Sequence, residues 1–246
     1  MIKFFRKIRQ KMFNKNKFSK YLIYALGEIF LVVIGILIAL QINNLNEQNK
    51  SKKKEIKILS EIRNNLIEDL KDHDQNIFYI TYKDSVFNRI ITLLNSDLPY
   101  DNTLSKSMMG ITLAGPHFNP IKTGYNTMTS NEPELISNDS LRINIAILYD
   151  TKYLWLESVL QDIYNNQNAW FAQIFLKRFK IIPNTSNHFE PIDFEKLKKD
   201  HEFISTLVYY RDYWANGVLR RYKDYRIDVN GLIDSIEKEI HQTQNQ

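Results

Sequence analysis

The sequence contains no cysteine and has only 7 glycines and 6 prolines among its 246 residues. Without cysteine, the chain can form neither a disulfide nor a thiolate nucleophile. Its few glycines build neither of the phosphate-binding patterns GxxxxGK(S/T) and GxGxxG, and no GxSxG nucleophile elbow. The five histidines form no HxxxH or HExxH set. These absences argue against an enzyme and against a bound cofactor, although a catalytic triad assembled across helices stays open.

Glycine and proline are also unevenly spread, since neither occurs between residues 36 and 98 or between residues 134 and 182. Because these two residue types interrupt regular structure, their long absence indicates long uninterrupted elements. Apolar side chains recur every three or four residues over 59–80, 145–174 and 203–240, which is helical spacing. No segment with strand-like alternation is long enough to predict a strand.

We therefore predict an all-α fold, in which an N-terminal transmembrane helix continues into an antiparallel bundle of three long helices. Residues 103–137 contain clustered glycine and proline and form an insert, with short helices around 104–113 and 121–130. Chain direction places this insert at the membrane-distal end of the bundle. Asn138 or Asp139 supplies the side-chain acceptor expected at the start of the second long helix.

The predicted transmembrane helix, residues 21–42, is a nearly continuous apolar run interrupted by one carboxylate, Glu28. About 20 apolar residues are enough to cross a hydrocarbon core as a helix. The run exceeds the apolar region of a typical signal peptide, and no small-residue cleavage site follows it. The sequence thus predicts a basic amphipathic cytoplasmic segment at 1–20, the transmembrane helix at 21–42 and a soluble bundle at 43–246.

Positive charge is concentrated before this helix. The first 20 residues carry eight Lys or Arg and no acid, which leaves 25 basic against 28 acidic residues in the rest of the chain. This distribution predicts contact of residues 3–20 with anionic lipid headgroups, as an interfacial helix or a disordered basic tail, and no nucleic-acid binding. Eight basic residues before the run against five shortly after it favour a cytoplasmic N-terminus and an extracytoplasmic bundle, which is periplasmic if the cell is Gram-negative.

Glu28 is the first candidate functional residue, because a carboxylate at membrane depth is costly. On a helix it shares a face with Gly35 and Ala39, whose small side chains allow two helices to approach closely. One interpretation is therefore a homo-oligomeric span in which Glu28 is neutral or bonded to a partner helix. In the other, Glu28 reaches toward the cytoplasmic headgroups and Gly35 has no role.

Asp69 and His73 are the second candidate, since residues spaced i,i+4 lie on one helical face and could bridge a divalent metal such as Zn or Mn. Such a site would suit a metal-dependent hydrolase. The competing interpretation, which we favour, is a solvated helix face with one histidine at the core seam.

Arg211, Arg221 and Tyr225 are the third candidate, on the aromatic and arginine-rich last helix. The planar guanidinium suits a carboxylate, so these residues could line a pocket for a small anion. Alternatively, the aromatic residues form bundle core and the arginines pair with acids of the first long helix, such as Asp69.

His117, Asn119 and Tyr125 are the fourth candidate, in a segment rich in side-chain donors where the insert turns. Loops that carry such donors often take part in recognition. The same side chains could equally cap the neighbouring helices.

Two stretches of the sequence resemble a known family. The first comprises KFSKYL at 17–22, ALGEI at 25–29 and LVVIGILIALQINN at 31–44, and the second comprises TGYNTM at 123–128 and LISNDSLR at 135–142. They are similar to motifs of a domain-of-unknown-function family of single-span membrane proteins from Bacteroidota. The chain has Leu45, Gly124 and Asn126 where that family usually has Trp, Ala and Glu. The resemblance implies an inner-membrane protein of Gram-negative bacteria and brings no activity with it.

Together these features lead to one principal hypothesis, a membrane-anchored helical interaction or sensing module that self-associates and acts through an unknown protein partner. The alternatives are a small-anion sensor that uses Arg211 and Arg221, and a metal-dependent hydrolase that uses Asp69 and His73.

Overall fold

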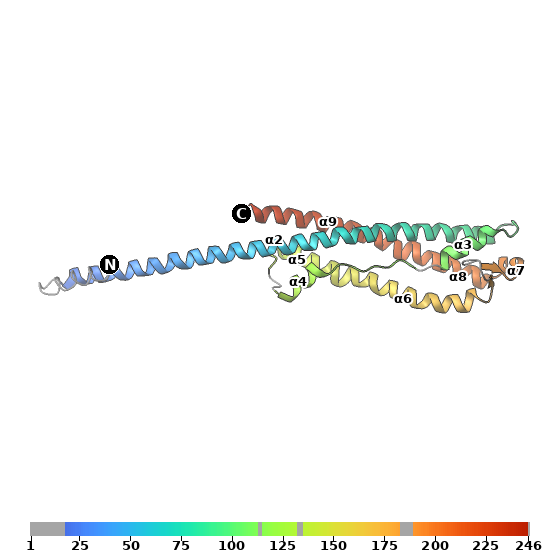
Figure 1. Ribbon diagram of the computed structural model, residues 1–246, viewed down its shortest axis with the longest axis horizontal. Helices are drawn as coiled ribbons and strands as arrows, with labels where there is room; N and C mark the ends of the chain where they lie inside the picture. Colours follow the sequence, from blue (N-terminus) through green and yellow to red (C-terminus); the bar gives the residue numbers. More distant parts are fainter. Residues whose placement is uncertain (1–17, 113–114, 132–134, 183–188, 246) are drawn as a thin grey trace. The chain divides into compact units, whose positions relative to one another are not determined.

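The computed structural model describes residues 18–112, 115–131, 135–182 and 189–245 (Figure 1). The predicted amphipathic segment lies almost entirely outside these described residues. The chain divides into two compact units, Met1–Lys54 and Glu55–Gln246. The predicted all-α fold is confirmed, because helices account for nearly all regular structure in the described residues.

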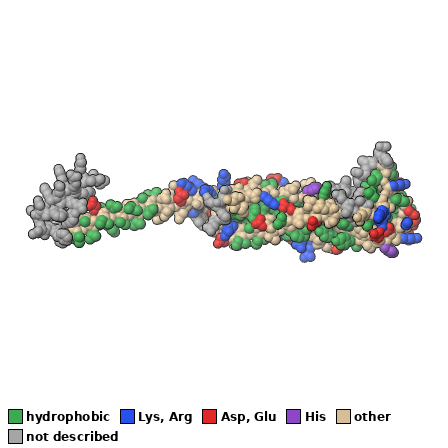
Figure 2. Space-filling view, turned by 90° about the horizontal axis from the view of Figure 1, so that it is seen from below, with side chains coloured by type: hydrophobic (Ala, Val, Ile, Leu, Met, Phe, Trp, Pro, Cys, Tyr) green, Lys and Arg blue, Asp and Glu red, His purple; other side chains and the backbone are tan. Residues whose placement is uncertain are grey.

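The described part of the first unit is helical and belongs to α2 (Phe18–Leu94). From Leu22 to Leu45 its large apolar side chains are exposed, and Figure 2 shows them as a nearly continuous hydrophobic surface. Within the described residues, one helix is long and apolar enough to cross a membrane, with a mean hydropathy of 2.6 in its most apolar window, none of which is buried in the protein.

The second unit contains the hydrophobic core. Its core residues come from every long helix, and the most deeply buried include Leu59, Ile145 and Phe203. After the second half of α2, the elements are α3 (Asn102–Thr112), α4 (Thr123–Asn131), α5 (Asp139–Ile147), η1 (Leu148–Tyr153), α6 (Leu154–Trp170), η2 (Phe171–Phe175), β1 (Phe179–Ile181), β2 (Phe189–Pro191), α7 (Phe194–Lys198), α8 (His201–Asp212), η3 (Tyr213–Leu219) and α9 (Arg220–Gln244).

Three helical rods make up this unit: the second half of α2, the run from α5 to η2, and the run from α8 to α9 (Figure 1). The rod from α5 to η2 runs in the same direction as the second half of α2, whereas α8 to α9 runs in the opposite direction. The antiparallel arrangement that was predicted for three successive helices therefore does not hold for the first two rods, because residues 115–122 return along the bundle between them. Asn138 is the N-cap of α5, where its side chain accepts a hydrogen bond from the Leu141 N–H at 3.1 Å. Asp200 caps α8 in the same way.

The two short helices predicted in the insert are present, and they lie at different places along α2. α3 packs near the end of α2, where a Cβ on Gly110 would lie 3.4 Å from the Val86 side chain. The chain then runs back along the bundle as the extended segment 115–122, so α4 contacts α2 at Ile62. The insert therefore does not lie as a whole at one end of the bundle, as the sequence predicted.

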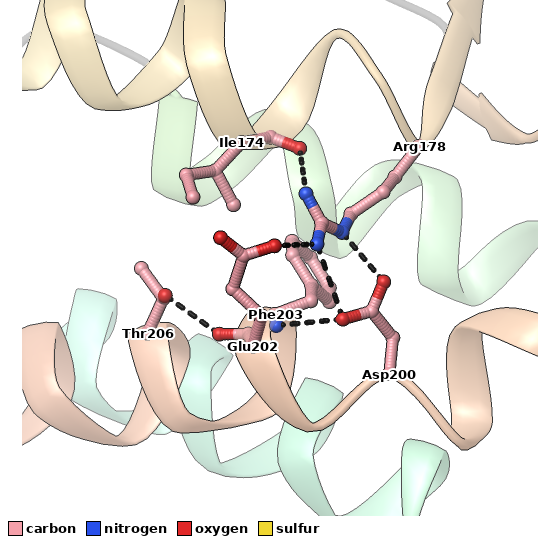
Figure 3. A network of polar contacts seen from close by, with 6 residues as sticks. All are labelled: Ile174, Arg178, Asp200, Glu202, Phe203 and Thr206. Atoms are coloured by element: carbon pink, nitrogen blue, oxygen red, sulfur yellow. Dashed lines mark hydrogen bonds and ion pairs between the residues drawn. The ribbon is translucent and has the colours of Figure 1, made fainter.

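A short antiparallel hairpin of β1 and β2, which the sequence did not predict, follows the second rod. Phe179 on β1 stacks on Phe175 with ring centroids 4.4 Å apart. Figure 3 shows how the turn into this hairpin is fixed to α8 by Arg178. Its guanidinium donates to both Asp200 oxygens at 2.8 and 3.1 Å, to Glu202, and to the Ile174 carbonyl at 2.9 Å.

Three segments within the rods, η1, η2 and η3, are π-helical rather than α-helical. A π-turn adds a residue to a helix and is frequent at functional sites. Here η1 carries the buried Tyr149 and Tyr153, and η3 carries the buried Trp214. Both segments therefore direct large aromatic residues into the bundle beside the features described next.

Candidate functional site

Polar side chains that are sealed inside the bundle form the first feature. We call Asp69, His73, Asn76, Tyr153 and Tyr222 the buried polar centre. Asp69 and His73 both lie on α2 and are 2% and 0% exposed, respectively. His73 lies in the core, as the favoured interpretation expected, but Asp69 is buried beside it instead of lying on a solvated helix face.

The side chain of Asp69 binds the backbone of the extended segment 115–122. Its Oδ1 accepts a hydrogen bond from the Ile121 N–H at 3.0 Å. Burial raises the pKa of the carboxyl to about 6, because a charge is poorly solvated in the interior. The Tyr153 hydroxyl lies near enough to lower this pKa slightly, but without hydrogen-bond geometry, and Oδ2 has no partner among the described residues.

His73 is surrounded by aromatic rings. Its ring centroid lies 5.0 Å from that of Phe118, 5.3 Å from that of Tyr222 and 5.9 Å from that of Tyr153. Neither ring nitrogen has a hydrogen-bond partner among the described residues. Burial lowers the pKa of His73 to about 4, so the imidazole is neutral at pH 7.

Asn76 provides a second attachment for the extended segment. Its Nδ2 donates to the His117 carbonyl at 2.8 Å and to the Tyr222 hydroxyl at 3.3 Å. Asp69 and Asn76 thus fix the backbone at residues 117 and 121 from beneath. This arrangement positions a wall of the bundle, and it leaves Asp69 and His73 with almost no surface for a substrate.

A metal site at Asp69 and His73 receives no further ligand from the described residues, since these contain no group of three or more His, Asp or Glu that could hold an ion. The imidazole is surrounded by the rings of Phe118, Tyr153 and Tyr222, and neither of its nitrogens has a polar partner among the described residues. The two residues are brought together on one face of α2, as their spacing predicted, but in an aromatic environment.

A cleft on the outer side of the extended segment is the second feature, and we call it the α6 cleft. It has a volume of about 380 Å³ and lies between residues 115–119, α6 and Trp214. Two of the predicted residues, His117 and Asn119, line it and are exposed. From α6 come Glu157, Leu160, Gln161, Ile163 and Tyr164.

Tyr125, which was predicted together with His117 and Asn119, lies elsewhere. It belongs to α4, is 6% exposed, and stacks on Tyr149 with ring centroids 4.6 Å apart. Its hydroxyl donates to the carboxylate of Asp150, and burial together with this bond raises its pKa. Tyr125 therefore packs α4 against η1 and does not line the α6 cleft.

The arginines predicted to bind an anion are not brought together. Arg211 on α8 forms an ion pair with Asp84 of α2, with Nε 3.1 Å from Oδ1. Arg221 on α9 lies over the Trp155 ring, with its guanidinium carbon 4.2 Å from the ring centroid. Tyr225 also contacts Trp155, at 6.4 Å between ring centroids. Arg221 and Tyr225 thus share one aromatic neighbour, whereas Arg211 has a separate partner.

In the first unit, Glu28, Gly35 and Ala39 are all exposed on α2. A Cβ built on Gly35 would have nothing within 4 Å, so this face of the helix has no contact in the protein. A shallow hollow of about 270 Å³ runs beside Glu28, between Ala25 and Val33.

Sequence reasoning placed Trp214 on the apolar face of the last long helix without assigning it a role, and it missed the buried Lys83; Trp214 lines the α6 cleft and Lys83 lies against it. Trp214 is 2% exposed, and the ammonium of Lys83, itself 2% exposed, lies 4.9 Å from its ring centroid. Burial lowers the pKa of Lys83 to about 8. A signal was present, because Ile80, Lys83 and Phe87 follow helical spacing and so place a lysine within an apolar stripe.

No match to this chain was found among curated proteins or among solved structures. A family model does match, over residues 28–197, which include most of α2, the extended segment and both walls of the α6 cleft except Trp214. Since the match covers more than half of the chain, the protein belongs to a family of unknown function (DUF6090).

Proposed function

We propose that this protein is a single-span membrane protein whose helical bundle works by binding rather than by turnover, as an interaction or sensing module. The main support is that the most apolar window of α2 is not buried in the protein, whereas Glu55–Gln246 has a hydrophobic core of its own. Contiguous apolar surface beyond a few hundred Å² is rare on soluble monomers and marks membrane or protein contacts. A bilayer covers such a surface on all sides of the helix.

Alkaline carbonate extraction of cell membranes tests this proposal, because it releases peripheral proteins and retains spanning ones. The full-length protein is expected in the pellet, and in the detergent phase after detergent partitioning. A matched variant with Ile34→Lys and Leu37→Lys inserts poorly, since each lysine at a span centre costs roughly 3 kcal/mol. Recovery of the wild-type protein in the carbonate supernatant would refute the proposal.

The charge distribution supports a cytoplasmic N-terminus and a bundle outside the inner membrane. Because the chain has no cysteine, single cysteines report topology without background. Asp97→Cys lies in the exposed segment that follows α2, and Lys15→Cys lies before the apolar run. A membrane-impermeant maleimide should label Asp97→Cys in spheroplasts and Lys15→Cys only after lysis. The reverse pattern would show the opposite orientation.

Self-association through the span is the second part of the proposal, supported by the open space at Gly35 and the exposed face it shares with Glu28 and Ala39. Small residues let helices approach closely in lipid, and a partner can satisfy the carboxyl. Gly35→Leu should weaken crosslinking in intact membranes, whereas Gly27→Leu, also open, is the control. A wild-type protein that never crosslinks would be monomeric and would rule this part out.

The two alternatives have less support. Arg211 already has Asp84 as its ion-pair partner, so a carboxylate ligand would have to compete with it. Asp69 and His73 are buried among aromatic rings, where almost none of their surface is open to a hydrolytic water. Binding by an exposed surface of the bundle is therefore the function that the geometry favours.

A further inference from the structure

The α6 cleft combines concavity, aromatic side chains and unused polar groups on the bundle surface. Its volume of about 380 Å³ lies within the range of small-molecule sites, about 300 to 1,000 Å³. We propose that this cleft binds an uncharged saccharide unit, an inference that gives a ligand class to the proposed binding module.

Charge is the first argument. Among the described residues that line the cleft, Glu157 is the only Asp, Glu, Lys or Arg. Both of its carboxylate oxygens accept hydrogen bonds from Lys122 Nζ at 3.0 Å, so its charge is compensated within the protein. An ionic ligand would lose its hydration without gaining an unpaired partner of opposite charge. The cleft therefore favours a neutral ligand.

Free hydrogen-bonding groups are the second argument. The side chains of His117, Asn119 and Tyr164 are exposed and make no hydrogen bond to other described residues. Gln161 donates one bond from Nε2 to Asn165 at 3.1 Å, which leaves its carbonyl oxygen available. Amide, imidazole and phenol groups both donate and accept, as do the hydroxyls of a sugar. A purely apolar ligand would leave these groups unmatched.

Aromatic and aliphatic surface is the third argument. Trp214, Leu160 and Ile163 form the buried floor at 2%, 9% and 8% exposure. Tyr164, which also lines the cleft, is 52% exposed, so its ring is accessible to a ligand. A pyranose has C–H groups on its faces and hydroxyls around its edge, so it can contact rings and amides at the same time. A sugar therefore matches the combination of an accessible ring and neutral polar groups in this cleft.

The wall that carries His117 and Asn119 is held in place before any ligand arrives. Asp69 and Asn76 bind its backbone from inside the bundle at 3.0 and 2.8 Å, respectively. Binding therefore does not have to order this segment, which reduces its entropic cost. The buried polar centre acts as a support for the cleft.

Calorimetric titration of the full-length protein tests the proposal, in a detergent without a sugar headgroup so that the micelle does not compete. The probes are N-acetylglucosamine and galactose as neutral pyranoses, with glucosamine as the cationic and glucuronate as the anionic control of the same ring size. Saturable binding of at least one neutral pyranose is expected, with both charged sugars bound about tenfold more weakly.

Two variants connect binding to the cleft. Asn119→Ala and Tyr164→Ala should each weaken the neutral sugar by about tenfold, since each removes an exposed contact. Tyr209→Ala removes a tyrosine that is 65% exposed and lies outside the cleft, and should bind as the wild type does. Circular dichroism confirms that all three are folded.

The outcomes separate this inference from the proposed function. No heat signal with either neutral sugar at millimolar concentration, tighter binding of a charged sugar, or equal binding by Tyr164→Ala overturns the saccharide assignment while leaving membrane anchorage intact. Recovery of the protein in the carbonate supernatant overturns the anchorage but leaves a positive sugar titration standing.

Discussion

Asp69 and His73 should make opposite and nearly equal contributions to the pH dependence of stability. Burial raises the pKa of Asp69 and lowers that of His73, so that the order of the two values is reversed in the folded state. The carboxyl pKa rises from 3.8 to about 6, and the imidazole pKa falls from 6.5 to about 4. One pKa unit corresponds to about 1.4 kcal/mol, so each shift represents roughly 3 kcal/mol. Both residues are at most 2% exposed, so solvent screening reduces these values little.

The signs follow from proton binding in the two states. The folded state holds the proton of Asp69 more tightly than the unfolded state, so its contribution to stability falls as pH rises from 3.8 to about 6. The folded state binds a proton on His73 more weakly, so its contribution rises between about pH 4 and 6.5. The wild-type free energy of unfolding should therefore change little from these two groups between pH 4 and 6.5.

Single variants should reveal each slope. With Asp69→Asn, which keeps an acceptor for the Ile121 N–H, the free energy of unfolding should increase by about 3 kcal/mol from pH 4 to 6.5. With His73→Phe, which keeps an aromatic ring among its neighbours, it should decrease by about the same amount. The double variant should again be nearly flat.

Urea denaturation of the full-length protein in detergent measures these slopes, with tryptophan fluorescence as the signal. All three tryptophans, Trp155, Trp170 and Trp214, lie in the second unit, so the signal reports on the bundle and not on the apolar helix. A surface control, Asp97→Asn, should keep the wild-type profile. If Asp69→Asn and His73→Phe show the same slope as the wild type, the two groups are not buried as described.

Three further substitutions should change stability in defined directions, all measured by the same denaturation. Gly124→Ala should lower the free energy of unfolding by about 1 to 3 kcal/mol, because the new Cβ would lie 2.9 Å from the backbone nitrogen of Ile62. Gly217→Ala has open space and should be neutral or slightly stabilising, so equal effects of the two variants would contradict the close approach at Gly124. Glu55→Ala should cost about 2 to 3 kcal/mol, since this buried carboxylate accepts bonds from the Ser137 N–H and hydroxyl at 2.7 and 2.8 Å, and Glu55→Gln should retain much of that stability. Burial lowers the pKa of Lys83 to about 8, so the charged form of this side chain is disfavoured in the folded state. Lys83→Met should therefore be most stabilising relative to the wild type near pH 7, and the difference in the free energy of unfolding should shrink as pH rises above 8. A difference that is independent of pH would argue against this.

The long helices were predictable because their apolar spacing is uninterrupted. Leu59, Ile62 and Leu66 follow each other at helical intervals, and all three are fully buried. The short helices were also predictable, since clustered glycine and proline set their limits. The β1–β2 hairpin was not, because three-residue strands have no detectable alternation, and its stability comes from phenylalanines that meet through the tertiary fold.

The candidate sites were harder to predict because they depend on which side chains meet across the bundle. The spacing of Asp69 and His73 gave their shared face but not their burial. The expected pairing of arginines with acids of the first long helix occurs at Asp84, for Arg211, and at Asp74, for Arg226. Asp69, the acid named for that role, binds a backbone N–H instead. The α6 cleft requires the return of the extended segment along the bundle, which no local pattern encodes.

The π-helical segment η3 has a consequence for how the length of this chain can vary. Removing one residue between Tyr213 and Leu219 would let the rod become a regular α-helix, and because the wider π-turns already absorb that residue, everything downstream would keep nearly the same face toward the core. Removing one residue from the regular helix between Arg220 and Asp228 would instead turn everything downstream by about 100° about the helix axis, and the buried Val229, Leu232 and Ile236 would leave the core. The length of the chain can therefore change more freely at η3 than in α9.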